Sequence, residues 1–161
     1  MCRRLTKPFM RLCSSLLLLS LCCVVGCVRE TPSTVPEWPV YYRLSLLSAQ
    51  GKPLNAPGGY VLITAPNTAY SQVGFAGLLV LRSVVGEEAY YAYDLACPYE
   101  RNQATRLRIN DALEAECPVC GSRFSILFGA GNPLQGPAQA PLLIYQVLRS
   151  APQELLIVNR H

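Results

Sequence analysis

Residues 95–124 read LACPYERNQATRLRINDALEAECPVCGSRF. This stretch decides the fold because it holds two Cys-Pro segments, and between them lies a short run, residues 105–109, in which basic and apolar residues alternate. Proline fixes its own φ and glycine permits a positive φ, so both segments are expected to be tight loops that follow strands. In such loops, successive backbone N–H groups can point inward at an anionic cluster or a metal thiolate. Cys-x-x-Cys alone is a moderate signal for metal or redox chemistry, and two cysteine-bearing loops in a β fold are more specific.

Outside this stretch, the chain after residue 39 consists of short β-type runs separated by turn residues. Nine of the chain's 13 prolines and ten of its 11 glycines follow residue 39, and no window has the periodicity of a long amphipathic helix. Asn110-Asp111 is typical of a tight turn. We therefore predict an all-β fold, a small antiparallel sandwich or barrel. The expected strands are 41–47, 60–64, 78–83, 89–95, 105–109, 124–128, 142–148 and 155–158.

The N-terminus has the features of a targeting segment. Four basic residues and no acidic one lie in residues 1–11, and residues 12–25 are almost wholly apolar. This apolar run is too short for an ordinary membrane-spanning helix and is typical of a secretory signal. It ends in Val24-Val25-Gly26-Cys27, which resembles the lipobox of bacterial lipoproteins. The resemblance implies acylation of Cys27 and cleavage before it.

Three segments follow from this interpretation. Residues 1–26 are expected to be a lipoprotein signal peptide, residues 27–39 the lipidated cysteine with a Pro-rich tether, and residues 40–161 the β domain. Acyl chains hold a protein durably on a bilayer, so we expect a lipid-anchored protein of the bacterial cell envelope that faces outside the cytoplasm.

Charge and histidine content exclude several functions. The net charge of +4 comes from the basic residues before Cys27, and the rest of the chain has ten basic and ten acidic residues. A nucleic-acid-binding domain would keep a basic excess, so no nucleic-acid partner is expected. The single histidine, His161, excludes an internal site that needs two and leaves no Ser–His–Asp set. We expect an electron-transfer or binding protein rather than an enzyme.

The cysteines divide between the leader and the domain. Four of the eight lie before Cys27, which leaves Cys97, Cys117 and Cys120 in the domain. Three is an odd number for a disulfide framework in an exported protein, and metal binding is one explanation.

The two cysteine loops resemble those of the Rieske iron–sulfur family. That family has Cys-x-His, then 15–17 residues, then Cys-x-x-His with Gly-Ser and an aromatic residue after it. Here Cys97-x-Tyr99 is followed by 17 residues and then by Cys117-x-x-Cys120-Gly121-Ser122. Residues 136–138, Gly-Pro-Ala, resemble the family's proline loop, and the likeness covers roughly residues 60–160. It implies a Rieske-like domain with a two-loop metal-binding tip.

This chain departs from the family at both histidine positions. The family binds one iron with two His and the other with two Cys. Here Tyr99 and Cys120 replace the two histidines, while Cys97 and Cys117 match the family's cluster cysteines. Cys120 can ligate as a thiolate, and Tyr99 or its neighbour Glu100 can supply an oxygen.

Four interpretations of the three cysteines stay open. They are a [2Fe–2S] cluster with an oxygen as the fourth ligand, a single Zn²⁺ with the same set, a disulfide from Cys97 to Cys117 or Cys120, and a fold without metal. The resemblance implies a membrane-anchored carrier of single electrons with a redox partner protein. The alternative is a non-redox binding or scaffold lipoprotein that holds zinc, a disulfide or no metal.

Overall fold

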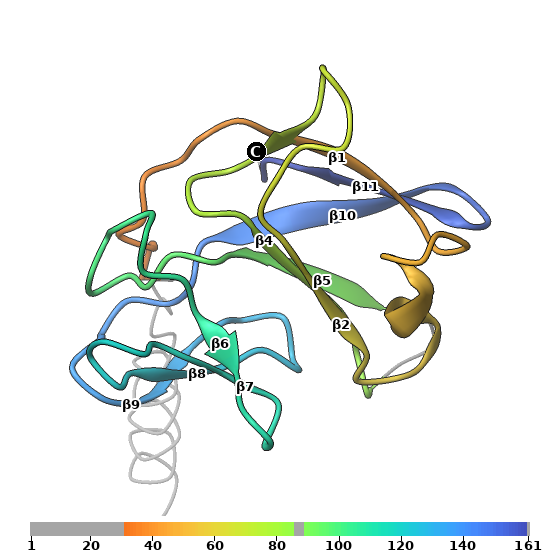
Figure 1. Cartoon of the computed structure of the whole chain (residues 1–161). Coiled ribbons are helices and arrows are strands. Elements are labelled where there is room, and N and C mark those ends of the chain that lie inside the picture. The colour runs from red at the N-terminus through yellow and green to blue at the C-terminus, as the bar shows by residue number, and fades with distance from the viewer. Residues whose placement is uncertain (1–30, 86–88, 161) are drawn as a thin grey trace, which may run out of the picture. The chain divides into compact units, whose positions relative to one another are not determined.

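The computed structural model describes residues 31–85 and 89–160, and this part of the chain is almost wholly β (Figure 1). One short 3-10 helix, η2, covers Lys52–Asn55. In these residues no helix has the length and apolar character needed to cross a membrane. The strands are Val40–Ser45 (β1), Tyr60–Ile63 (β2), Gln72–Val73 (β3), Leu78–Arg82 (β4), Tyr90–Asp94 (β5), Arg108–Ile109 (β6), Glu114–Glu116 (β7), Arg123–Ser125 (β8), Pro133–Gln135 (β9), Ile144–Ala151 (β10) and Glu154–Val158 (β11).

Seven strands form the main sheet, in the order β2-β4-β5-β10-β11-β1-β3, and every pairing is antiparallel. The sheet curves until it is nearly closed into a barrel (Figure 1). Strand β4 is buried on both faces, because Leu78 to Leu81 are all apolar and almost fully enclosed. Tyr93 and Phe124 are among the largest fully buried side chains, and both belong to the one hydrophobic core. The predicted all-β, antiparallel fold is confirmed.

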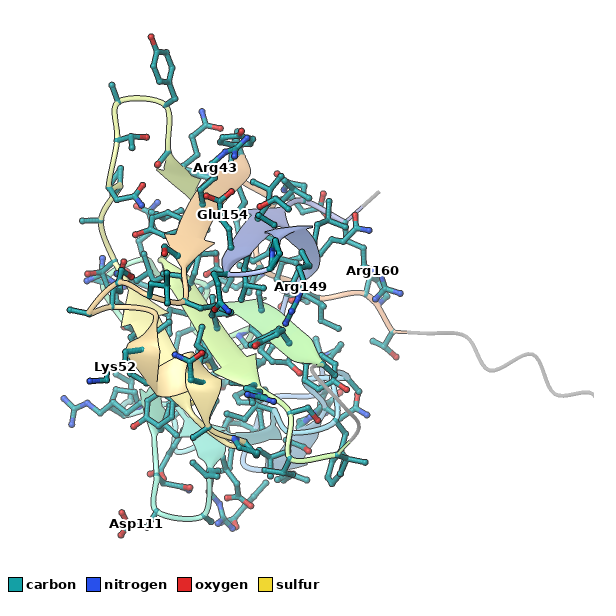
Figure 2. The ribbon with its side chains drawn as sticks, turned by 90° about the vertical axis from the view of Figure 1, so that its right-hand side faces the viewer. Arg43, Lys52, Asp111, Arg149, Glu154 and Arg160 are labelled. Atoms are coloured by element: carbon teal, nitrogen blue, oxygen red, sulfur yellow. The ribbon has the colours of Figure 1, made fainter. Side chains whose placement is uncertain are left out.

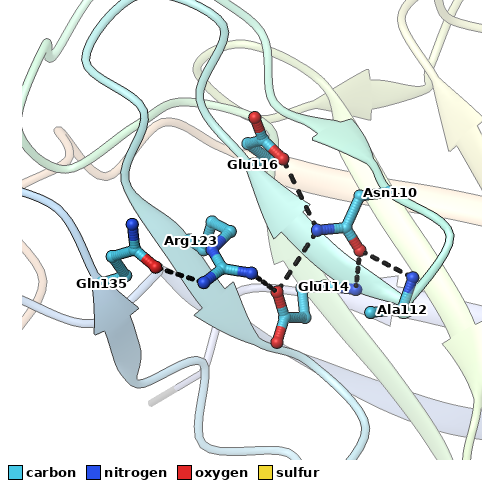
Figure 3. A network of polar contacts seen from close by, with 6 residues as sticks. All are labelled: Asn110, Ala112, Glu114, Glu116, Arg123 and Gln135. Carbon is cyan, nitrogen blue, oxygen red and sulfur yellow. Dashed lines mark hydrogen bonds and ion pairs between the residues drawn. The ribbon is translucent and has the colours of Figure 1, made fainter.

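The second sheet is small and carries the second cysteine loop. Its order is β6-β7-β8-β9, and the loop joins β7 to β8. At the β6–β7 turn, the Asn110 side-chain oxygen accepts hydrogen bonds from the N–H groups of Ala112 and Glu114, both at 3.0 Å. The network continues across the sheet from Glu114 to Arg123 at 3.0 Å and from Arg123 to Gln135 (Figure 3). These bonds join the β6–β7 turn to strands β7, β8 and β9.

The charged side chains on the main sheet form ordinary surface contacts. Arg43 and Glu154 lie side by side where β1 and β11 pair, and they form an ion pair at 3.0 Å (Figure 2). Arg149 lies with its guanidinium carbon 5.7 Å from the centre of the Tyr90 ring. Exposed ion pairs contribute about 0–1 kcal/mol, so the core rather than these pairs stabilises the sheet.

Several expected strands differ from those observed. Only Arg108–Ile109 of the expected run 105–109 is a strand of the small sheet, because Arg106 forms an isolated bridge with Ala96 instead. The run expected at 124–128 ends at Ser125, shortly before a turn that begins at Leu127, and β10 extends to Ala151. Strands β3, β7 and β9 were not predicted.

Residues 31–39, the described part of the expected tether, contact the β domain. Val35 is buried, and the Thr34 hydroxyl donates to the Pro98 carbonyl at 2.5 Å. The Trp38 ring packs edge-on against Phe75, with ring centres 5.4 Å apart. This segment therefore reaches the loop that carries the first cysteine. The expected signal peptide, residues 1–26, and Cys27 lie outside the described residues.

Candidate metal centre

The first cysteine loop is held by a buried carboxylate at the end of β5. Asp94 is fully buried, and its oxygens accept hydrogen bonds from the N–H groups of Phe75 at 2.8 Å, Ala76 at 3.1 Å and Ala96 at 2.8 Å. The Tyr145 hydroxyl donates to the same carboxylate at 2.7 Å. These four donors come from three segments, so Asp94 ties the end of β5, which leads into the first loop, to residues 75–76 and to β10.

Burial determines how Asp94 and Tyr145 titrate. Burial raises the pKa of the Asp94 carboxyl above its ordinary value, although the Tyr145 hydroxyl and the three N–H groups oppose this shift. Burial likewise raises the pKa of the Tyr145 hydroxyl, and the nearby Asp94 charge adds to that shift. Tyr145 therefore stays protonated and keeps donating to Asp94 at all ordinary pH values.

The second cysteine loop closes the β7–β8 hairpin. The Cys117 N–H donates to the Ser122 carbonyl at 2.9 Å, and the Gly121 N–H donates to the Cys117 carbonyl at 3.0 Å. Gly121 has a φ of +69°, a left-handed conformation that glycine adopts without strain. The sequence therefore supplies glycine where this turn needs it.

These two loops bring the three cysteines of the domain together. Their sulfur atoms all lie within 4.8 Å of one another, and the Sγ atoms of Cys97 and Cys120 are 3.7 Å apart. All three are free thiols. Cys97 and Cys117 are fully buried, and Cys120 is half-buried. Among the described residues, no imidazole or carboxylate joins this group.

The thiols differ in how readily they ionise. Burial raises the pKa of the Cys97 thiol to about 12, although the backbone N–H groups of Glu100 and Tyr99 act against it. Burial also opposes ionisation of Cys120, but hydrogen bonds from Ser122 and the neighbouring thiols outweigh it and lower the pKa of the Cys120 thiol. A metal ion would therefore find Cys120 more easily ionised and would displace a proton from Cys97.

The loop at 136–138 lies against the second cysteine loop. The Ala138 N–H donates to the Ser122 hydroxyl oxygen at 3.0 Å, and this oxygen is also 3.1 Å from the Cys120 sulfur. Gly136 approaches so closely that an added Cβ would lie 2.5 Å from the Ser122 Cα. Ser122 is fully buried, and its hydroxyl oxygen connects the sulfur group with the Gly-Pro-Ala segment.

No protein-family model matches the chain, and no curated protein matches it. Among solved structures, the chain is similar to the ferredoxin of carbazole 1,9a-dioxygenase from Nocardioides aromaticivorans. The TM-score is 0.44 and the identity 19%, over 75% of this chain and 99% of that chain. What the centre can bind follows from its own donor atoms.

Tyr99, the expected oxygen ligand, faces the solvent in part. Tyr99 is 54% exposed, and it lines a hollow of about 880 Å³ together with Thr31, Pro32, Thr34, Pro98, Arg101 and residues 137–140. Its backbone, in contrast, lies close enough to the Cys97 thiol to act against the rise in that thiol's pKa. Ligation through the Tyr99 hydroxyl stays a prediction.

Two residues of the centre were not identified from the sequence as parts of it. Asp94 was not predicted to belong to it, although a charged residue inside the apolar run Ala92 to Ala96 indicates a buried carboxylate that needs donors. Ser122 belongs to the second loop motif, which does not predict its contact with Ala138. Its bond to Ala138 depends on tertiary contact across 16 residues. Cys27, the expected lipidation site, lies outside the described residues.

Proposed function

We propose that this chain is a lipid-anchored envelope protein whose β domain binds a metal ion through the thiolates of Cys97, Cys117 and Cys120. The observation that carries the proposal is the convergence of three sulfur atoms within 4.8 Å, at the tip formed by two loops. Free thiols at this spacing form a soft donor set, which suits Zn²⁺ or iron. Cys27 would attach the protein to a bacterial membrane and the domain would face outside the cytoplasm.

A single ion is the occupant that the distances favour. Four ligands around Zn²⁺ at about 2.3 Å give a tetrahedron whose edges are about 3.8 Å long. The 3.7 Å between the Cys97 and Cys120 sulfurs agrees with one such edge. The loops supply three ligands, and a fourth from an oxygen completes the tetrahedron. We therefore propose Zn²⁺ in a binding or scaffold protein rather than in an enzyme.

Carriage of single electrons by a [2Fe–2S] cluster is the second candidate. Its support is the spacing of the loops, which resembles that of the Rieske family, and the partial exposure of Cys120, which would bring a centre close to a redox partner protein. In that family, Cys97 and the residue at position 120 would bind different irons. Their sulfurs are as close as two ligands of one ion, and for this reason the single ion is preferred.

Element analysis of the full chain tests both candidates. The protein would be purified from membranes, and zinc, iron and acid-labile sulfide would be measured per chain together with the absorption spectrum. We expect one zinc and no sulfide. Changing Cys97, Cys117 or Cys120 singly to Ala should abolish stoichiometric binding, because each supplies one of few ligands. The control is Cys27→Ser, which should keep its metal.

The outcomes separate the candidates. Iron and sulfide in equal amounts would establish the cluster, and its potential should then lie near about −400 mV without the pH dependence that histidine ligands confer. Binding that persists in all three alanine variants would refute the metal centre.

A further inference from the structure

The two Cys-Pro segments form the same turn twice. What we infer from this repetition rests on the proposed metal binding. Residues 97–101 read CPYER and residues 117–121 read CPVCG. In each, the N–H of the fifth residue donates to the carbonyl of the first cysteine, at 2.8 Å for Arg101 and 3.0 Å for Gly121. In each, the three middle positions are in a turn conformation.

The fifth residue has the same unusual backbone conformation in both turns. Gly121 has a φ of +69° and Arg101 a φ of +50°. For a residue with a side chain, this left-handed conformation costs about 1–2 kcal/mol. Arg101 is one of two non-glycine residues with positive φ in the described part of the chain. The first segment thus adopts the second segment's turn despite lacking its glycine.

When the two turns are compared position by position, every residue of one turn has a counterpart in the other. The leading cysteines, Cys97 and Cys117, are both fully buried, and both contribute to the sulfur group. The third residues, Tyr99 and Val119, are both exposed, at 54% and 65%. The fourth residue of the second turn is Cys120, whose sulfur belongs to the group. Its counterpart in the first turn is Glu100.

We propose that the Glu100 carboxylate is the fourth ligand of a single Zn²⁺ held by Cys97, Cys117 and Cys120. A carboxylate oxygen is an established zinc ligand, at about 2.0–2.2 Å, and three thiolates with one oxygen complete a tetrahedron. The backbone of Glu100 lies close enough to the Cys97 thiol to act against the rise in its pKa, so the residue borders the group. Its half-buried side chain does not belong to the 4.8 Å group, so ligation requires rotation about its side-chain torsions.

This assignment favours Glu100 over Tyr99 as the oxygen ligand. The third residue of each turn, Tyr99 or Val119, is largely exposed, whereas the three sulfur-bearing cysteines are buried or half-buried. The fourth position supplies a ligand in the second turn. Carboxylate oxygens are among the usual ligands of Zn²⁺ in proteins, and phenol oxygens are not.

Cobalt substitution tests the assignment on the full chain. Co²⁺ is bound in place of Zn²⁺, and its affinity and absorption spectrum are compared for the natural protein, Glu100→Gln, Glu100→Cys and the matched control Tyr99→Phe. Glu100→Gln should weaken binding by about tenfold or more, since loss of even an outer-shell partner costs that much. Glu100→Cys should strengthen the sulfur-to-cobalt charge-transfer band by adding a thiolate. Tyr99→Phe should change neither quantity.

The result that would overturn the assignment is an unchanged affinity and spectrum in Glu100→Gln, or a loss of binding in Tyr99→Phe. Either would leave the proposed metal binding standing, provided that Cys117→Ala abolishes it. If the natural protein binds no Co²⁺, or takes up two irons with sulfide, then the single-ion centre itself is wrong.

Discussion

Removing the Ser122 hydroxyl should destabilise the domain by breaking the connection between two loops. Ser122 is fully buried, and its oxygen accepts the Ala138 N–H at 3.0 Å. In Ser122→Ala, that N–H has no acceptor and no access to water, which costs about 1–3 kcal/mol. With a urea dependence of about 1–3 kcal/mol per molar for a small protein, the unfolding midpoint should fall by about 1 M.

Urea denaturation of the metal-free protein measures this change without a contribution from bound metal. Ser125→Ala is the matched control, because Ser125 is half-buried on the same hairpin and the hydrogen bond it makes uses its backbone N–H to Asn132. The control should move the midpoint far less than Ser122→Ala. Equal midpoints for the two variants would refute the reasoning, since they would show that the buried N–H finds another partner.

Three further changes have defined outcomes. Cys27→Ser should release the protein from membranes into the soluble fraction, because the acyl chains are the expected anchor. Gly136→Ala should lower the unfolding free energy by about 1–3 kcal/mol, since the residue combines a φ of +94° with an added Cβ only 2.5 Å from the Ser122 Cα. Asp94→Asn should change the pH dependence of stability. Because burial raises the pKa of Asp94, the unfolded chain releases this proton first, and the stability of the natural protein relative to the variant should fall as pH rises above 3.8.

Each of these outcomes can fail in a recognisable way. A Cys27→Ser protein that stays on membranes after a high-salt wash would exclude the lipid anchor. A Gly136→Ala protein of unchanged stability, measured by thermal unfolding, would show that the loop moves away from Ser122 at little cost. If the relative stability of the natural protein instead rises with pH in urea titrations, the four donors hold Asp94 ionised more strongly than burial opposes it.

The sequence predicts the long and regular elements of the fold. The apolar run of β4 and the aromatic run of β5 are each five residues long, enough for strand composition to be evident. Asn110 identifies its turn through the side-chain oxygen that caps it. Strands β3, β7 and β9 have two or three residues, which is too short for any period to appear.

The cysteine spacing predicts which residues form the centre but not its geometry. Cys97, Cys117 and Cys120 follow from the two loop motifs, whereas the 3.7 Å between two of the sulfurs depends on how β5 and the β7–β8 hairpin approach each other in space. The equivalence of Glu100 and Cys120 is likewise hidden in the sequence. It becomes evident only when the left-handed backbone of Arg101 is seen beside that of Gly121.

The pairing of the first and last strands determines when the domain can finish folding. Tyr41 of β1 lies opposite Val158 of β11, and the Val40 N–H is bonded to Asn159, 119 positions later. Contacts of such long sequence separation form slowly, in about milliseconds to seconds for all-β domains. While the chain is being synthesised, β1 has no partner from β11, whereas the β7–β8 hairpin needs only neighbouring residues. The second cysteine loop can therefore form before the barrel, and a chain shortened by its last strand would leave β1 with an unpaired edge that favours aggregation.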